Sequence, residues 1–167
     1  MKKILSLALA LAMIGTALTG CGSKDAATKT PAENTQQTAP VQQEQSQTEK
    51  ALALINTFAT GDTDTARSLL ADGYIQHNLA YGTGADAFIG SVEYLASADV
   101  KTTVNNIRAF EDGDKVFLQT IYNFAGAGEQ VAFDIFRFDG DGKIAEHWDV
   151  METIADQSTW RNQNGKF

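Results

Sequence analysis

A change in the spacing of apolar residues near residue 99 constrains the fold more than any other feature of this sequence. Before it, apolar residues recur at the three- and four-residue spacing of an amphipathic helix. After it come runs rich in β-branched and aromatic residues, separated by short Gly-containing turns. Helices followed by closely spaced strands predict an α+β domain, with the helices gathered on one face of a curved antiparallel sheet.

Three helices are expected in the first part of this domain. Ser46 and Glu49 have the spacing of a capping box, with Thr48 as a rival cap, and Gly61 stops the apolar stripe that follows. The expected elements are a first helix from about Ser46 to Gly61, a second and shorter helix from 62 to 72, an extended segment at 74–78 and a third helix at 85–96.

Four apolar runs in the second part predict strands at 100–110, 115–124, 129–138 and 143–151. Their short connections favour antiparallel pairing between neighbours. Apolar side chains occupy both faces of these strands, whereas a sheet with one solvated face alternates more cleanly. The second face therefore needs a cover. A second copy of the chain, giving a homodimer, is the simplest cover, and the tail from Thr153 to Phe167 is the competing one.

The amino-terminal segment has the features of a bacterial export signal. Lys2 and Lys3 precede an apolar stretch over 4–18, and Leu18-Thr19-Gly20-Cys21 matches the lipobox, whose cysteine is lipidated after cleavage. Residues 1–20 are thus expected to be removed. Cys21 would then anchor the protein to the cell membrane, facing outside the cytoplasm. The alternative is an uncleaved anchor followed by a free structural cysteine.

Residues 21–47 are expected to form a disordered linker, because they are mostly polar, lack aromatic side chains and contain both prolines of the chain. Cys21 is the only cysteine, so the domain beyond the linker has neither a thiol nucleophile nor an internal disulfide.

The formal net charge of −8 argues against a nucleic-acid partner, because acidic residues outnumber basic ones by 21 to 13 and no basic stripe is present. An anionic lipid surface would also repel the domain. The covalent lipid is therefore the expected contact with the membrane.

The segment over 134–150 carries the residues that are hardest to explain by structure alone. Asp139-Gly140-Asp141-Gly142 supplies the turn of a hairpin. His147 and Asp149 are two residues apart on the strand after it, so they point to the same side. A carboxylate and an imidazole directed into one cavity can transfer protons. The alternative is that both face solvent on an edge strand.

Two segments resemble a known family. Asp134-Ile135-Phe136-Arg137-Phe138, followed by the turn and Glu146-His147-Trp148-Asp149-Val150, resembles the end of a SnoaL-like polyketide cyclase domain, in the nuclear-transport-factor-2-like superfamily. Tyr74-Ile75-Gln76-His77-Asn78 resembles an upstream segment of that family, with Leu79 where proline is often found. The resemblance covers residues 48–156 and leaves 157–167 as a C-terminal tail.

This resemblance implies a cone-like fold, an apolar cavity between the helices and the sheet, and no requirement for a metal or cofactor. In the family an aspartate near the end of the domain acts as general base, and Asp149 is its positional match. His147 is the candidate acid or orienting partner, and Asp134 and His77 are further catalytic candidates. The expected lining residues are Tyr81, Tyr122, Phe136 and Trp148.

Several of these residues also have a structural interpretation. Asp134 could pair with Arg137 or Arg108, and His77 could end a strand by bonding a backbone carbonyl. Trp148 alternates with His147 and Asp149, so a regular strand would point it away from them. Tyr81 could be a surface aromatic in its Gly-rich loop. A His-His-carboxylate metal triad lacks any recognised spacing, so no metal is expected.

Two functions fit these observations. The first is a cofactor-independent enzyme that enolises, cyclises or isomerises a small apolar carbonyl compound. The second is a non-catalytic module, tethered to the membrane, that binds a hydrophobic ligand or a partner protein. Polyketide intermediates are normally handled in the cytoplasm, so export argues against the named cyclase reaction.

Overall fold

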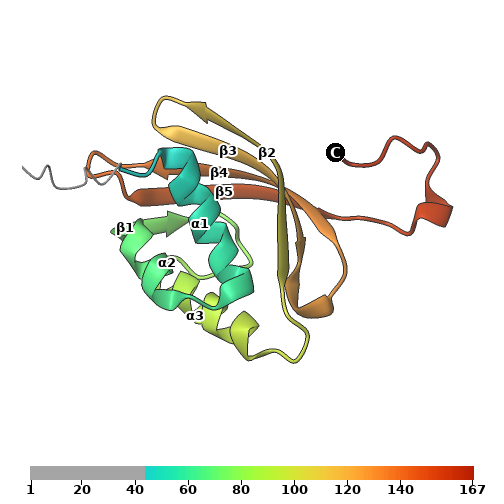
Figure 1. Ribbon diagram of the computed structural model, residues 1–167, viewed down its shortest axis with the longest axis horizontal. Coiled ribbons are helices and arrows are strands. Elements are labelled where there is room, and N and C mark those ends of the chain that lie inside the picture. Colours follow the sequence, from blue (N-terminus) through green and yellow to red (C-terminus); the bar gives the residue numbers. More distant parts are fainter. Residues whose placement is uncertain (1–43) are drawn as a thin grey trace, which may run out of the picture. The chain divides into compact units, whose positions relative to one another are not determined.

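A curved five-stranded sheet folds around three helices in the computed structural model, which describes residues 44–167 (Figure 1). The predicted signal peptide, Cys21 and most of the predicted linker lie outside the described residues. The elements in chain order are α1 (Gln47–Thr60), α2 (Thr63–Leu69), β1 (Leu70–Gln76), α3 (Ala85–Ser97), β2 (Thr103–Asp112), β3 (Lys115–Asn123), the 3-10 turn η1 (Phe124–Gly126), β4 (Gln130–Phe138), β5 (Ile144–Thr153) and the 3-10 turn η2 (Gln157–Thr159).

The strand order β1-β5-β4-β3-β2 confirms the predicted meander and adds one strand to it. β2, β3, β4 and β5 pair in antiparallel fashion, whereas β1 runs parallel to β5 at the edge. The sheet is therefore mixed rather than purely antiparallel. The parallel pair is possible because α3, β2, β3 and β4 lie between β1 and β5 in the chain, which supplies the long crossover that such pairing needs.

The ends of the helices follow from local side-chain chemistry. Ser46 caps α1: its Oγ accepts from the Glu49 backbone N–H at 3.1 Å, and the Glu49 carboxylate accepts from the Ser46 N–H at 2.7 Å. Gly61 ends α1 with φ of 73°, and a Cβ there would lie 2.8 Å from the Ala96 Cβ, so only glycine fits. Among the described residues, no helix is long and apolar enough to cross a membrane.

The second helix ends earlier than the sequence predicts. The expected end at residue 72 is wrong, because α2 stops at Leu69 and Leu70 already has extended backbone and pairs with Ile144 of β5. Leu69 and Leu70 are both buried although they belong to different elements. Two adjacent buried leucines give no signal of where a helix gives way to a strand.

The two faces of the sheet are covered differently. Apolar side chains of α1 and α3, such as Leu54 and Val92, pack on the inner face against Val116 and Leu118 of β3, and all four are buried. On the outer face, the C-terminal tail turns back toward the sheet (Figure 1). The Gln119 side chain of β3 donates to the Lys166 carbonyl of this tail at 2.8 Å.

This tail covers only part of the outer face. Lys166 also pairs with Glu152 of β5 at 2.6 Å. The neighbouring Ile121 and Val131 are buried, whereas Phe133 is 54% exposed. Of the two predicted covers, the tail therefore accounts for one end of the face, and the homodimer remains a prediction.

Candidate functional site

A cavity of about 640 Å³ lies between the inner face of the sheet and the helices. Most of its wall is apolar, with Phe58 from α1, Phe88 from α3, Phe124 after β3 and Met151 from β5. Its acids and its histidine come from the middle of β4 and β5, and Gln76 comes from the end of β1. A cavity of this size with few polar groups is typical of a small-molecule site.

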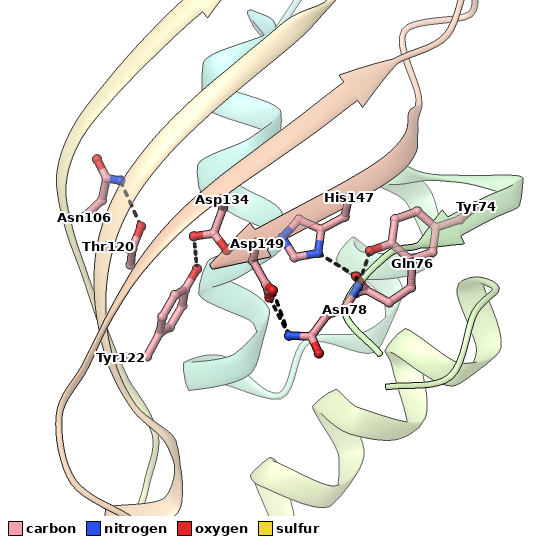
Figure 2. A network of polar contacts seen from close by, with 9 residues as sticks. All are labelled: Tyr74, Gln76, Asn78, Asn106, Thr120, Tyr122, Asp134, His147 and Asp149. Carbon is pink, nitrogen blue, oxygen red and sulfur yellow. Dashed lines mark hydrogen bonds and ion pairs between the residues drawn. The ribbon is translucent and has the colours of Figure 1, made fainter. Parts of the chain in front are cut away.

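His147 lies at the centre of the polar groups (Figure 2). Its Nε2 is 3.2 Å from Asp134 Oδ1, and its Nδ1 is 3.1 Å from Gln76 Oε1. The ring stacks on Phe136 with centroids 4.5 Å apart. Because His147 and Asp134 are both buried, their contact is poorly screened by water.

Hydrogen bonds around Gln76 determine which nitrogen of His147 carries a proton. The Asn78 backbone N–H donates to Gln76 Oε1 at 2.9 Å, so this atom must be the amide oxygen. Gln76 Oε1 can only accept, and His147 Nδ1 must therefore donate to it. With its proton on Nδ1, a neutral ring would have a bare Nε2, which is an acceptor and would face the Asp134 oxygen, also an acceptor. One further proton must therefore lie between Nε2 and Asp134. His147 is then an imidazolium beside a carboxylate, or Asp134 is protonated and donates to the ring.

Tyr122 completes the surroundings of Asp134. Its hydroxyl donates to Asp134 Oδ2 at 3.0 Å. Burial raises the pKa of the Tyr122 phenol well above its ordinary value, and the negative charge of Asp134 raises it further. The phenol therefore stays protonated and holds the carboxylate in a fixed orientation.

Asp149 faces Asp134 directly across the β4–β5 ladder. The Asn78 side-chain NH₂ donates to both Asp149 oxygens, at 2.7 and 2.9 Å. Asn78 is itself oriented, because its Oδ1 accepts from the Ala80 backbone N–H at 2.9 Å. Asp149 is only half-buried, so a ligand in the cavity can reach it.

Most of the predicted site residues come together in this cavity. Asp134, His147 and Asp149 line it, as do Tyr81, Tyr122 and Phe136. Burial raises the pKa of the Tyr81 phenol, and the charge of Asp149 adds to this effect. The structure places these side chains, while their catalytic and binding roles remain predictions.

Two predicted site residues do not reach the cavity. His77 and Trp148 stack on each other at 4.6 Å, nearly parallel, and His77 Nε2 lies 3.8 Å from Glu146 on the same outer side. Their predicted place in the cavity is wrong because each alternates with an inward-facing neighbour on a regular strand. The predicted bridge from Asp134 to an arginine is also wrong for Arg137, which pairs with Glu146 at 3.0 Å.

Sequence reasoning missed Gln76 and Asn78. Both belong to the segment that resembles the family, in which the sequence analysis names His77 as the candidate. The available signal was the alternation of Tyr74, Gln76 and Asn78, since buried Tyr74 marks the inward side of β1.

One group of side chains has the composition of a metal site. Ligand atoms of Asp134, His147 and Asp149 all lie within 4.8 Å of one another. The predicted alternative of two histidines and a carboxylate does not form, because His77 is on the other side of the sheet. The cavity is far larger than a bare ion needs, and each of the three side chains already has a hydrogen-bonding partner in the protein.

Comparison with known proteins places this geometry in a family. The profile of the SnoaL-like domain matches residues 51–147. No curated protein sequence shows significant similarity to the chain.

Similar solved structures share the fold at low sequence identity. An NTF2-like protein of unknown function from Cytophaga hutchinsonii is 16% identical, with a TM-score of 0.57 over 66% of this chain and 94% of that one. IdmH, a proposed polyketide cyclase from Streptomyces antibioticus, is 19% identical, with a TM-score of 0.52 over 65% and 93%. An LEH-like epoxide hydrolase from M. tuberculosis is 19% identical, with a TM-score of 0.54 over 62% of this chain and 80% of that one. These likenesses confirm the predicted cone-like α+β fold.

Proposed function

The chain belongs to the SnoaL-like domain family, and from this premise we propose that its cavity is a cofactor-independent acid/base active site for a small apolar carbonyl compound. The observation that carries the proposal is the arrangement of Asp149 opposite the proton-sharing pair of Asp134 and His147. The reaction class is enolisation, cyclisation or isomerisation. The fold is shared with proteins described as a cyclase and an epoxide hydrolase, which supports a site of this kind.

Asp149 is the proposed general base. Its carboxylate borders the cavity, and Asn78 holds its orientation. Over residues 44–167, no arginine or lysine lines the cavity. A positioned carboxylate of this kind can take a proton from carbon next to a carbonyl group. The carbonyl oxygen then gains negative charge.

The pair of Asp134 and His147 is proposed to stabilise that developing charge. Its shared proton can be donated as a hydrogen bond toward the enolate oxygen, and the proton on Asp149 later returns to carbon. Tyr122 and Gln76 hold the pair from either side, so the donor is oriented before the substrate arrives. Proton number is conserved through the cycle, and no external oxidant or reductant is needed.

Deuterium exchange tests this proposal without knowledge of the natural substrate. The purified protein is incubated in D₂O with 2-tetralone, an apolar ketone with acidic α-protons, and exchange is followed by proton NMR. We expect acceleration over buffer, and Asp149→Asn should reduce it by roughly 10²- to 10⁴-fold, the usual value of a positioned base. Asp141→Asn, in the exposed hairpin turn, is the matched control. Equal exchange by wild type and Asp149→Asn would contradict the base assignment.

A non-catalytic binding module is the second candidate. Both Asp149 oxygens accept hydrogen bonds from Asn78, which is also what a purely structural carboxylate would do. If Asp149 is purely structural, Asp149→Asn should lower the melting temperature and leave ligand affinity nearly unchanged. If Asp149 contacts the ligand of a binding module, Asp149→Asn should shift the affinity by about tenfold.

We also propose that the protein is an exported lipoprotein, anchored by Cys21 to the outer side of the cell membrane. The support is the lipobox after a charged and apolar leader. Cys21→Ser should move the protein from the membrane fraction to the soluble fraction, and a variant that stays in the membrane would contradict the assignment.

A further inference from the structure

The cavity is lined by few ionisable groups, so their net charge can be worked out one group at a time. All lining residues belong to the part of the chain that the structure describes, and their acids and bases are Asp134, His147 and Asp149 besides the tyrosine phenols. No lysine or arginine is among these lining residues. The nearby Arg137 is directed to Glu146 on the outer side of the sheet.

With Asp149 a carboxylate that accepts from Asn78 through both oxygens, the groups of the site carry at least one negative charge. His147 Nδ1 donates to Gln76, and one further proton lies between His147 Nε2 and Asp134. If the proton is on His147, the imidazolium balances Asp134 and leaves Asp149 charged. If it is on Asp134, the imidazole is neutral and Asp149 is again charged. Any arrangement with fewer protons only adds negative charge.

Among the described residues, no lysine or arginine pairs with Asp149 to balance this charge. Its hydrogen bonds come from the Asn78 amide, which is neutral. The neighbouring Tyr81 responds to the same field, since the negative charge of Asp149 contributes to the raised pKa of its phenol. The carboxylate therefore offers a complementary cation a favourable position at the edge of an apolar space.

The walls of the cavity suit an organic cation better than a bare ion. Phe58, Phe88, Tyr122 and Phe124 form a packed aromatic cluster that lines it, with Phe58 and Phe88 centroids 4.9 Å apart and Tyr122 stacked on Phe124 at 4.9 Å. Aromatic faces attract ammonium groups and also bury hydrocarbon. The volume of about 640 Å³ is that of a site for a drug-sized molecule.

We infer that the cavity selects hydrophobic organic cations, with an ammonium group at Asp149 and the apolar part of the molecule against the aromatic cluster. This inference names the ligand class of the site in the proposed function and rests on that site being open to ligands. A substrate of this class is an amine-bearing carbonyl compound, for which one Asp149 oxygen binds the ammonium group and the other faces the α-carbon. Carboxylate and phosphate compounds are disfavoured because their charge repeats that of Asp149.

Three small molecules of matched skeleton test this inference by calorimetric titration of the purified protein. The probes are 2-naphthylmethylamine, which is a cation at neutral pH, the neutral 2-naphthalenemethanol, and the anionic 2-naphthoate. We expect the amine to bind at least about tenfold more tightly than the alcohol, and the naphthoate more weakly than either. Comparable affinity of the wild type for amine and alcohol would overturn the inference, and so would binding of none of the three.

A variant locates the selectivity at one side chain. Asp149→Asn keeps the shape of the carboxylate and removes its charge, so the amine should lose its advantage and bind within about threefold of the alcohol. Asp141→Asn should keep the full preference. An undiminished preference in Asp149→Asn would also overturn the inference.

The exchange assay separates this inference from the proposed catalysis. Selective amine binding without acceleration of 2-tetralone exchange would contradict the enzyme and support the cation site. Acceleration of exchange without any preference for the amine would support the enzyme and contradict the cation site.

Discussion

Asp134 and Asp149 face each other across β4 and β5 inside the cavity, while their neighbours Phe133 and Val150 face each other outside the sheet. The inner pair consists of acids, with Asp134 only 4% exposed, whereas the outer pair is apolar and 54% and 72% exposed. Ordinary folding would favour the opposite arrangement, because burying a carboxylate costs free energy and an exposed phenyl ring contributes little. Both departures therefore indicate function.

The inner face shows how the cost of burial is reduced. Asp134 has a shared proton and a phenol donor, and Asp149 has an amide donor. Such a network stabilises the fold only while every member is present, so it also fixes the geometry of the site. The polar groups are thus oriented before any ligand binds.

The outer face lacks any comparable compensation. Phe110, Phe117, Phe133 and Val150 are exposed on adjacent strands, and the C-terminal tail reaches only the end near Gln119 and Glu152. A contiguous apolar patch of this kind favours association. We propose that a second copy of the chain covers it.

The largest expected effect is on the inner face. His147→Phe keeps an aromatic ring against Phe136 but removes the shared proton and leaves Asp134 and Asp149 facing each other unbalanced. The free energy of unfolding should fall by about 3–5 kcal/mol, the usual cost of breaking a buried ion pair. Urea denaturation at neutral pH measures it.

The neighbouring Trp148 provides the matched control. Trp148→Phe keeps an aromatic ring against His77 on the outer side and should cost less than about 1 kcal/mol. If His147→Phe and Trp148→Phe lower the free energy of unfolding equally, the inner and outer faces do not differ in the way described here.

Association through the outer face comes next in size. Phe133→Glu places a charge in the middle of the proposed dimer contact, so the dimer dissociation constant should rise at least ~100-fold, or about 2.7 kcal/mol. Light scattering on protein that lacks residues 1–20 and carries Cys21→Ser gives the mass. Asn56→Glu, on the exposed side of α1, is the control. A wild-type protein that is already monomeric at micromolar concentration would leave the tail as the only cover.

The smallest effect appears at alkaline pH and again belongs to the inner face. Burial raises the pKa of Tyr74 and Tyr122, with the acids of the site adding to it, so these phenols bind their protons more tightly folded than unfolded. Their contribution to stability is complete below the unfolded pKa of about 10 and is lost as pH rises toward the folded pKa. In that range each should lower the free energy of unfolding by about 1.4 kcal/mol per pH unit.

A comparison of tyrosine variants checks this slope. Tyr122→Phe should remove the contribution of one tyrosine to the fall of the free energy of unfolding per pH unit. Urea denaturation between pH 9 and 11 measures this fall. Tyr94→Phe, a change at an exposed ring, is the matched control. A slope that Tyr122→Phe does not alter would show that this buried phenol is not responsible.

The sequence predicted the elements well where a local signal existed. The Ser46 cap, the Gly61 stop and the four meander strands all rest on side chains close in sequence, and all are present. The parallel pairing of β1 with β5 was not predictable in this way. It depends on contact between segments some seventy residues apart, such as Gln76 with His147.

The candidate site was predictable to the extent that alternation along one strand reveals it. The alternation of side chains along a strand places His147 and Asp149 on one side, because they are two residues apart. It also predicts correctly that Trp148 points away from them. Applied to β1, it would have chosen Gln76 and Asn78 over His77. The proton shared with Asp134 required the structure, because it follows from hydrogen bonds among three different strands.

The protonation of His147 tests the central claim most directly, since the proposed catalysis depends on the proton that it shares with Asp134. The chain has two histidines, so a His77→Gln variant leaves His147 as the only source of imidazole signals in a two-bond proton–nitrogen NMR correlation. We predict that Nδ1 carries hydrogen in the folded protein, with the second proton shared between Nε2 and Asp134. A neutral ring with hydrogen only on Nε2 and a bare Nδ1 would contradict the account.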